Sequence, residues 1–466
     1  MSFGSLIFLC AFFPLVLLGY FTIPQKGKNA FFIFASLFFY SWGNSGYLVL
    51  LISSILITYG TGLLLHRFRE HEKKRRAAML LGVVISTSLL VYFKYYAFLL
   101  DNINAWFGWQ IPNPDIGMPL GISFFTFKSL SYILDVYFQR AQPNKSFLQV
   151  ALYVSLFPHL ISGPIVQYNE MCGQLAARKV DTELFCSGIQ RFVLGLSKKV
   201  LLADILGLKA DTIFSSVVYG IDTPTAWLGL VAYTLQIYLD FSGYSDMAIG
   251  LGRMFGFTCG ENFRYPYIST SITEFWRRWH ISLSTWFRDY LYIPMGGNRR
   301  GNVYLHLLVV FLVTGIWHGA SWNFVLWGLW HGLFLVIEKI LIKKNKFDSI
   351  PLWLRWPAAM LIVMLGWVLF RTTTLEAAGQ YLGYLFGAVT APMVEFGFRY
   401  YLDTRLLWVL AISAFASVPL AARWAEHHRD SRWFRYAAAP ALLCLMVVCM
   451  VFVINSDYSP FIYFQF

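Results

Sequence analysis

The chain has 466 residues, of which 58% are hydrophobic and only 13% charged, and its formal net charge is +13. An average soluble domain carries about 25% charged residues, so this composition excludes a soluble enzyme, a disordered chain and a secreted disulfide scaffold. The chain must lie mainly in lipid. The positive charge would suggest nucleic acid as a partner of a soluble protein, but in a membrane protein Lys and Arg mainly mark cytoplasmic loops.

Long apolar runs predict membrane-spanning helices, because crossing the hydrocarbon core takes roughly 20 residues. We expect an all-α polytopic membrane protein with about 11 crossings. The run 226–256 is long enough to be broken, and Gly243 is the residue that could break it. The runs are 3–22, 30–43, 47–65, 78–100, 118–138, 148–166, 226–256, 303–317, 320–342, 352–370, 405–421 and 437–455.

Basic residues set the expected topology. Residues 1–20 contain no Lys or Arg, and Lys26 and Lys28 follow the first span. The positive-inside rule places these residues and the later basic clusters in the cytoplasm. Both chain termini are then expected outside, in a bacterial inner membrane. The later clusters are 66–76, 277–300, 339–346 and 423–435.

The polar-rich stretch 257–302 interrupts the apolar pattern. Ser271 and Glu274 fit a capping box, which predicts a helix to about Tyr290 that lies in the membrane interface with its cationic side toward the cytoplasm. Its apolar side would consist of Phe275, Trp279, Leu283, Trp286 and Tyr290. The opposite side would carry Arg277, His280, Ser284 and Arg288.

The cationic side of this predicted helix has two possible functions. Arg side chains could hold the phosphates of an acyl donor, with His280 one helical turn from Arg277. The simpler account is attraction to anionic lipid headgroups, which needs no donor. From the spacing alone, the lipid interpretation is favoured.

His318 is the most informative residue, because it lies between two apolar stretches, in Gly-Ile-Trp-His-Gly-Ala-Ser-Trp at 315–322. An ionisable residue inside a span is costly and is a functional candidate by default. An imidazole can act near neutral pH as the general base that activates a hydroxyl. A core histidine hydrogen-bonded to a backbone carbonyl explains the spacing equally well.

Asp240 and Asp246 also interrupt an apolar run. Six residues apart, they fall on different faces of a straight helix, so they do not form an obvious acid pair. An ion pair of one of them with Arg253 is at least as good an account as a functional role.

The sequence gives little support to other classes of protein. The six cysteines show no C-x-x-C pair and no zinc-finger spacing, so neither a disulfide nor a metal site is expected. No nucleophile elbow, P-loop or H-E-x-x-H motif occurs. A transporter whose buried His and Asp relay protons is the alternative from a different class, although no inverted repeat is visible.

Taken together, several segments resemble the membrane-bound O-acyltransferase family, and most closely its bacterial alginate O-acetyltransferase branch. They extend over most of residues 120–340 plus the C-terminus, and only their combination is specific. The segments are 121–127, 157–164, 239–246, 262–267, 274–284, 288–294 with 296–299, 316–320 and 461–466.

The resemblance implies a helical fold around a central tunnel that is reachable from both membrane faces. It makes His318 the essential catalytic histidine and His280 the counterpart of a second motif position. The remaining motif members are expected to bind substrate. They are Arg277, Arg288, Ser284, Asp240, Asp246 and Trp317.

The resemblance also implies a reaction. A cytoplasmic thioester such as acetyl-CoA would bind near the cationic segment, and His318 would activate a hydroxyl that enters from the other face. No cofactor would stay bound. The acetyl group would pass to a separate extracytoplasmic esterase-like partner and on to a surface polysaccharide. Within the family, a D-alanyl transferase to teichoic acid is the alternative.

One membrane domain, 1–466, would accommodate this reaction. Residues 1–115 would form peripheral helices, 116–342 the catalytic core with the cytoplasmic segment 257–302, and 343–466 the C-terminal helices.

Overall fold

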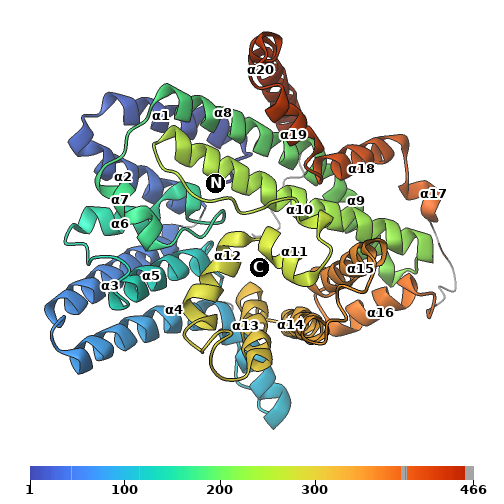
Figure 1. Cartoon of the computed structure of the whole chain (residues 1–466), viewed down its shortest axis with the longest axis horizontal. Coiled ribbons are helices and arrows are strands. Elements are labelled where there is room, and N and C mark those ends of the chain that lie inside the picture. Colours follow the sequence, from blue (N-terminus) through green and yellow to red (C-terminus); the bar gives the residue numbers. More distant parts are fainter. Residues whose placement is uncertain (44, 115, 390–393, 395, 457–466) are drawn as a thin grey trace. The chain divides into compact units, whose positions relative to one another are not determined.

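The computed structural model describes residues 1–43, 45–114, 116–389, 394 and 396–456. These residues form helices and no β-strand, which confirms the all-α prediction (Figure 1). They divide into two compact units, the first with residues 1–192 and 245–260, the second with 193–244 and 261–466. The C-terminal segment 461–466, which carried part of the family resemblance, lies outside the described residues.

The first unit is built around a core of aromatic rings. The ring of Phe157, for example, lies 5.3 Å from that of Phe32 and 5.4 Å from that of Phe39. Its helices are α1 (Phe13–Thr22), α2 (Lys28–Ser41), α3 (Leu48–Arg67), α4 (Glu72–Phe107), α5 (Ile122–Tyr137), α6 (Phe147–Ser155), α7 (Tyr168–Ala176) and most of α8 (Thr182–Ser197).

The expected span 148–166 is wrong. Helix α6 ends at Ser155, and a 3-10 turn follows at Phe157–His159. A proline in this turn has no N–H for a helical hydrogen bond, which explains why the helix does not continue. The first unit therefore contains a buried, irregular segment where the apolar run alone indicated a helix.

The second unit contains the remaining helices. They are α9 (Asp204–Ser215), most of α10 (Thr223–Met254), α11 (Ile272–Arg278), α12 (Ile281–Phe287), α13 (Val303–His318), α14 (Trp322–Lys343), α15 (Leu352–Arg371), α16 (Leu375–Leu385), α17 (Phe398–Tyr401), α18 (Thr404–Ala416), α19 (Leu420–His427) and α20 (Arg432–Asn455). Helices α13 and α14 form a hairpin, because only three residues separate them.

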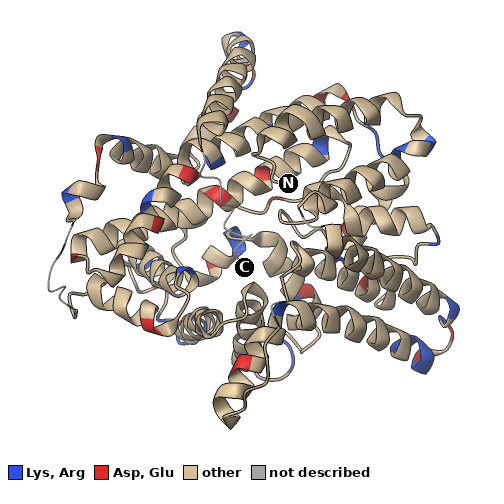
Figure 2. Ribbon diagram, turned by 180° about the vertical axis from the view of Figure 1, so that it is seen from behind, with Lys and Arg blue, Asp and Glu red and all other residues tan. Residues whose placement is uncertain are grey.

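Several helices are long and apolar enough to cross a membrane, and Figure 2 shows long stretches of helix without charged residues. Among the described residues there are five such helices, or six if the bent pair α18 and α19 forms one span. They make this a multi-pass membrane protein and account for about half of the crossings predicted from the apolar runs. The five are Ser45–Arg67, Glu72–Phe107, Trp322–Lys343, Leu352–Arg371 and Arg432–Asn455.

Gly243 does not break its helix, contrary to the expectation for the run 226–256. Helix α10 is continuous from Thr223 to Met254. A Cβ atom added to Gly243 would lie only 2.7 Å from the carbonyl oxygen of Gly195. The glycine therefore allows α10 to pack closely against the C-terminal end of α8, which belongs to the second unit.

The interfacial helix predicted from Ser271 to about Tyr290 is also interrupted. Helix α11 ends at Arg278, α12 begins at Ile281, and a π-helical turn follows at Arg288–Tyr292. Its apolar side packs against protein rings rather than lipid: Trp279 lies 4.9 Å from Trp367, measured between ring centroids. His280, expected on the cationic side, is completely buried.

Candidate active site

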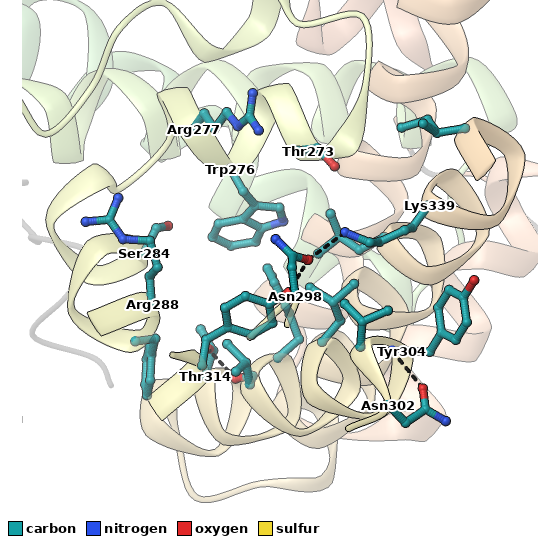
Figure 3. Close-up of a pocket in the computed structure, with 18 of the residues that line it drawn as sticks. Thr273, Trp276, Arg277, Ser284, Arg288, Asn298, Asn302, Tyr304, Thr314 and Lys339 are labelled. Atoms are coloured by element: carbon teal, nitrogen blue, oxygen red, sulfur yellow. Dashed lines mark hydrogen bonds between the residues drawn. The ribbon is translucent and has the colours of Figure 1, made fainter. Parts of the chain in front are cut away.

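A pocket of about 860 Å³ lies in the second unit, between the segment 273–304 and helices α13 and α14 (Figure 3). None of the residues that line it is acidic. Three residues that the sequence placed on one helix side, Arg277, Ser284 and Arg288, are brought together in its lining. Most of the remaining lining is apolar or aromatic.

The pocket has a charged mouth and a buried apolar end. Exposed lining residues mark the mouth; they are Arg277, Arg288, Asn298, Gly301, Asn302, Ile342 and Lys343. Buried lining residues mark the inner end; they are Trp276, Leu283, Phe287, Val310, Thr314 and Leu335. A ligand with an anionic head and a thin apolar arm fits such a gradient.

Arg277, Arg288 and Lys339, three cations that line the pocket, differ in how far their charge is compensated by neighbouring groups. Arg288 forms a two-pronged contact with Asp289, at 2.7 and 3.1 Å. Lys339 donates to the amide oxygen of Asn298 at 2.8 Å, a neutral partner that leaves its charge in place. Arg277 has no ion pair within the described residues. Arg277 and Lys339 therefore contribute more positive potential than Arg288.

The start of α11 is fixed by two carboxylates. Ser271 accepts a hydrogen bond from the N–H of Glu274 at 3.0 Å, which confirms the predicted N-cap, while Glu274 accepts from the N–H of Thr270 at 2.9 Å. Glu338, buried on α14, accepts from the N–H of Ile272 at 2.8 Å and from the next N–H at 3.2 Å. This orients α11, and with it Trp276, relative to α14.

His280 is in the left-handed backbone region, with φ +42°, where a residue with a Cβ is strained. Asn262 holds this turn: its Oδ1 accepts from the N–H and hydroxyl of Ser282 at 3.2 and 2.9 Å and lies 3.2 Å from Nδ1 of His280. Because the N–H of Ser282 can only donate, the atom it faces is an oxygen. Nδ1 of His280 therefore carries the proton and donates.

His318 is the last residue of α13 and is only 4% exposed. Aromatic rings surround its imidazole, among them Trp317 and Trp327 at 5.0 Å and Phe370 at 5.1 Å. Thr314, which lines the pocket, precedes it by one helical turn and therefore lies on the same face of α13. His318 thus lies one turn beyond the inner end of the pocket.

Trp317 connects the two candidate histidines. Its ring centroid lies 5.0 Å from that of His318 and 6.3 Å from that of His280. The backbone of α14 lies directly against Gly315, since a Cβ atom at this residue would collide with the carbonyl oxygen of Phe324. The glycine thus serves the packing of α13 on α14.

The two aspartates are held in separate ion pairs and do not line the pocket. Asp240, 2% exposed, lies 2.9 Å from Nζ of Lys199 in the second unit. Asp246 belongs to the first unit and lies 2.7 Å from Arg191. The prediction that one of the two aspartates forms an ion pair with Arg253 is therefore wrong.

Four residues that shape the site were missed in the sequence. Asn262 and Trp276 lie in recognised segments, 262–267 and 274–284, but were not singled out. Glu338 carries no motif signal, and Lys339 was interpreted only as a topology marker. Within the described residues, no three His, Cys, Asp or Glu side chains are grouped so that they could hold a metal ion.

Comparison with known proteins identifies the class of this site. Residues 37–365 match the model of the membrane-bound O-acyltransferase family. The chain belongs to this family. The predicted enzyme class, an O-acyltransferase in a multi-pass membrane protein, is thereby confirmed.

Relatives of this acyltransferase act on different cell-surface polymers, to judge from their names. "Probable alginate O-acetylase AlgI" of Pseudomonas putida is 38% identical over the full length of both chains. "Peptidoglycan O-acetyltransferase" of Helicobacter pylori is 34% identical over 100% of this chain and 97% of its own. "Teichoic acid D-alanyltransferase" of Bacillus subtilis is 30% identical over 53% of this chain and 65% of its own.

Proposed function

We propose that this membrane acyltransferase moves an acetyl group from cytoplasmic acetyl-CoA to a hydroxyl acceptor on the other side of the membrane. The observation that carries the proposal is the pocket, which has a cationic mouth and an acid-free lining and ends one helical turn from His318. Acetyl-CoA combines phosphates, which Arg and Lys bind, with a thin arm that suits an apolar cavity.

The assigned chemistry is base-assisted acyl transfer. A nitrogen of His318 accepts the proton of the acceptor hydroxyl while its oxygen attacks the thioester carbonyl carbon. The carbon–sulfur bond then breaks, and the leaving thiolate takes up the proton. Buried surroundings keep out water that would hydrolyse the thioester, and His280 orders the site through its contact with the ring of Trp317.

Other parts of the proposal concern membrane topology. We assign about 11 crossings, a tunnel that leads from the pocket past His318 to the opposite face, and extracytoplasmic termini in an inner membrane. Residues 116–342 form the catalytic core in this arrangement, flanked by 1–115 and 343–466. The cationic mouth of the pocket then faces the cytoplasm, where acetyl-CoA is made available.

The acceptor is a cell-surface polysaccharide, reached through an extracytoplasmic esterase-like partner protein. Two full-length relatives support this class of acceptor, since their names specify O-acetylation of alginate and of peptidoglycan. No nucleic acid takes part.

Inverted membrane vesicles test the proposal, because their cytoplasmic face is outside and accessible to added acetyl-CoA. We expect radiolabel from the acetyl group to appear in the lumenal polymer and protein fraction, with release of free CoA. His318→Ala should abolish this transfer, whereas His427→Ala, at an exposed position on α19, should not change it. Full transfer by the His318 variant would refute the role of this residue.

D-alanyl carrier protein is the alternative donor, because one relative is named a teichoic acid D-alanyltransferase. The same vesicles, supplied with D-alanyl carrier protein in place of acetyl-CoA, separate the two donors. Label transfer from the carrier protein alone would replace acetyl-CoA in the proposal while leaving the pocket and His318 in their roles.

A further inference from the structure

The buried end of the pocket is closed by Trp276. Its indole is 6% exposed and projects into the pocket from α11, next to Arg277 at the mouth (Figure 3). Across the pocket, Thr314 on α13 forms the other side of the same end. Trp276 is therefore the largest of the buried side chains that line the pocket.

The Trp276 ring is fixed in place by its neighbours. Its centroid lies 5.0 Å from Phe311, 5.2 Å from His331 and 5.6 Å from Trp327, each with a steep angle between the ring planes. Its Nε1 donates to Nδ1 of His331 at 3.4 Å. A ring held on several sides cannot rotate away without breaking these contacts.

Trp327 continues this wall toward the catalytic histidine. It is completely buried, does not line the pocket, and its ring lies 5.0 Å from that of His318. Trp276 thus adjoins the pocket and contacts Trp327, and Trp327 in turn contacts His318.

We propose that Trp276 determines the acyl chain length that the enzyme accepts. This inference rests on the proposed function of the pocket as the donor site. A two-carbon acetyl group occupies the space left beside the indole, whereas each further methylene meets a close-packed, immobile ring. Pockets that exclude one methylene discriminate by about 10-fold or more. Replacement of the indole by a small side chain would extend the cavity to Trp327.

The test compares acetyl-, butyryl- and hexanoyl-CoA as donors in the same inverted vesicles. We expect the wild type to prefer acetyl-CoA. Trp276→Ala should raise the ratio of hexanoyl to acetyl transfer at least 10-fold, and Trp276→Phe should give an intermediate ratio. Because transfer ratios are compared within one variant, differences in protein amount cancel.

Trp367→Ala is the matched control. Trp367 is 1% exposed and belongs to the same cluster of rings, 6.3 Å from Trp327, but does not line the pocket. Its variant loosens the cluster and should leave the ratio unchanged. If Trp276→Ala does not yield folded protein, Trp276→Phe and Trp276→Leu decide by the same ratio.

The outcomes separate the two proposals. Wild-type vesicles that transfer none of the three acyl groups overturn both. Transfer by the wild type with a ratio that stays within twofold in the Trp276 variants overturns only the assignment of Trp276. An equal rise of the ratio in Trp367→Ala also overturns it, because the effect would then come from general loosening.

Discussion

The Nδ1 atom of His280 lies 3.2 Å from the Oδ1 atom of Asn262, and this contact holds a histidine in the left-handed backbone region. The same amide oxygen serves two donors of Ser282. A sharp turn between α11 and α12 thus depends on one buried side chain, Asn262, which is 1% exposed.

We expect Asn262→Ala to destabilise the protein by about 1–3 kcal/mol, because it leaves buried donors without their acceptor. The strained turn should then relax, and the imidazole of His280 should lose its position beside Trp317. Thermal unfolding in detergent and the rate of acetyl transfer measure the two effects. As a control, Asn104→Ala removes an exposed amide that bonds only within a surface turn, and should change neither quantity appreciably.

The second prediction concerns the buried charges around Lys199. Lys199 lies 2.9 Å from Asp240 and 2.6 Å from Asp204, and all three side chains are largely buried. Lys199→Met should cost about 3–5 kcal/mol of stability, since it leaves buried carboxylates uncompensated. Lys209→Met, which breaks a half-exposed pair with Asp403, should cost less than about 1 kcal/mol.

A double-variant cycle then decides between a structural and a substrate-binding role of Asp240. If Asp240 serves the ion pair, adding Asp240→Asn to Lys199→Met should restore part of the lost stability. Strictly additive losses, together with an increased KM for acetyl-CoA in Asp240→Asn alone, would instead support the substrate-binding role that the family resemblance implied.

A third prediction follows from the pKa of Glu274. Partial burial raises this pKa, but the hydrogen bonds from Thr270 and Arg278 outweigh the effect, so the pKa lies below its ordinary value of 4.5. The unfolded chain releases this proton at a higher pH than the folded protein does. Glu274 therefore stabilises the fold above pH about 4.5, and this contribution is lost as the pH falls through the lower folded pKa.

Glu274→Gln should accordingly lower the unfolding midpoint at pH 7, and this effect should shrink as the pH falls below about 4.5 and disappear below the folded pKa. Since the carboxylate is 33% exposed, solvent screens the effect and it should be small. Unfolding followed by intrinsic fluorescence between pH 7 and the acid limit of the folded protein measures it. A difference that grows toward acid pH would contradict the sign.

Local signals were sufficient for some of these features. The N-cap at Ser271 was predictable because a helix start depends on residues three positions apart. The grouping of Arg277 with Arg288 was predictable from their spacing. The turn at His280 was not, because the group that stabilises it, Asn262, comes from a different segment.

Contacts between residues far apart in the sequence account for the other differences between the predicted and the observed structure. Asp240 was expected to pair with a residue on its own helix, but Lys199 comes from the π-helical segment Lys198–Ala203, between α8 and α9. Glu338 caps α11 from 66 positions along the chain. Such contacts depend on how helices pack, which periodicity alone does not determine.

The last prediction distinguishes the cations at the mouth of the pocket. Arg288 is already paired with Asp289, whereas Arg277 has no ion pair within the described part of the chain. Arg277→Ala should therefore raise the KM for acetyl-CoA more than Arg288→Ala does. The increase should shrink at high salt, because screening weakens the same interaction in the wild type.

S-acetyl-pantetheine lacks the nucleotide phosphates, so its KM should be insensitive to both changes. Arg423→Ala, at an exposed position on α19 outside the pocket lining, controls for net charge. Equal effects of Arg277→Ala on acetyl-CoA and S-acetyl-pantetheine would show that this side chain positions the thioester rather than the phosphates.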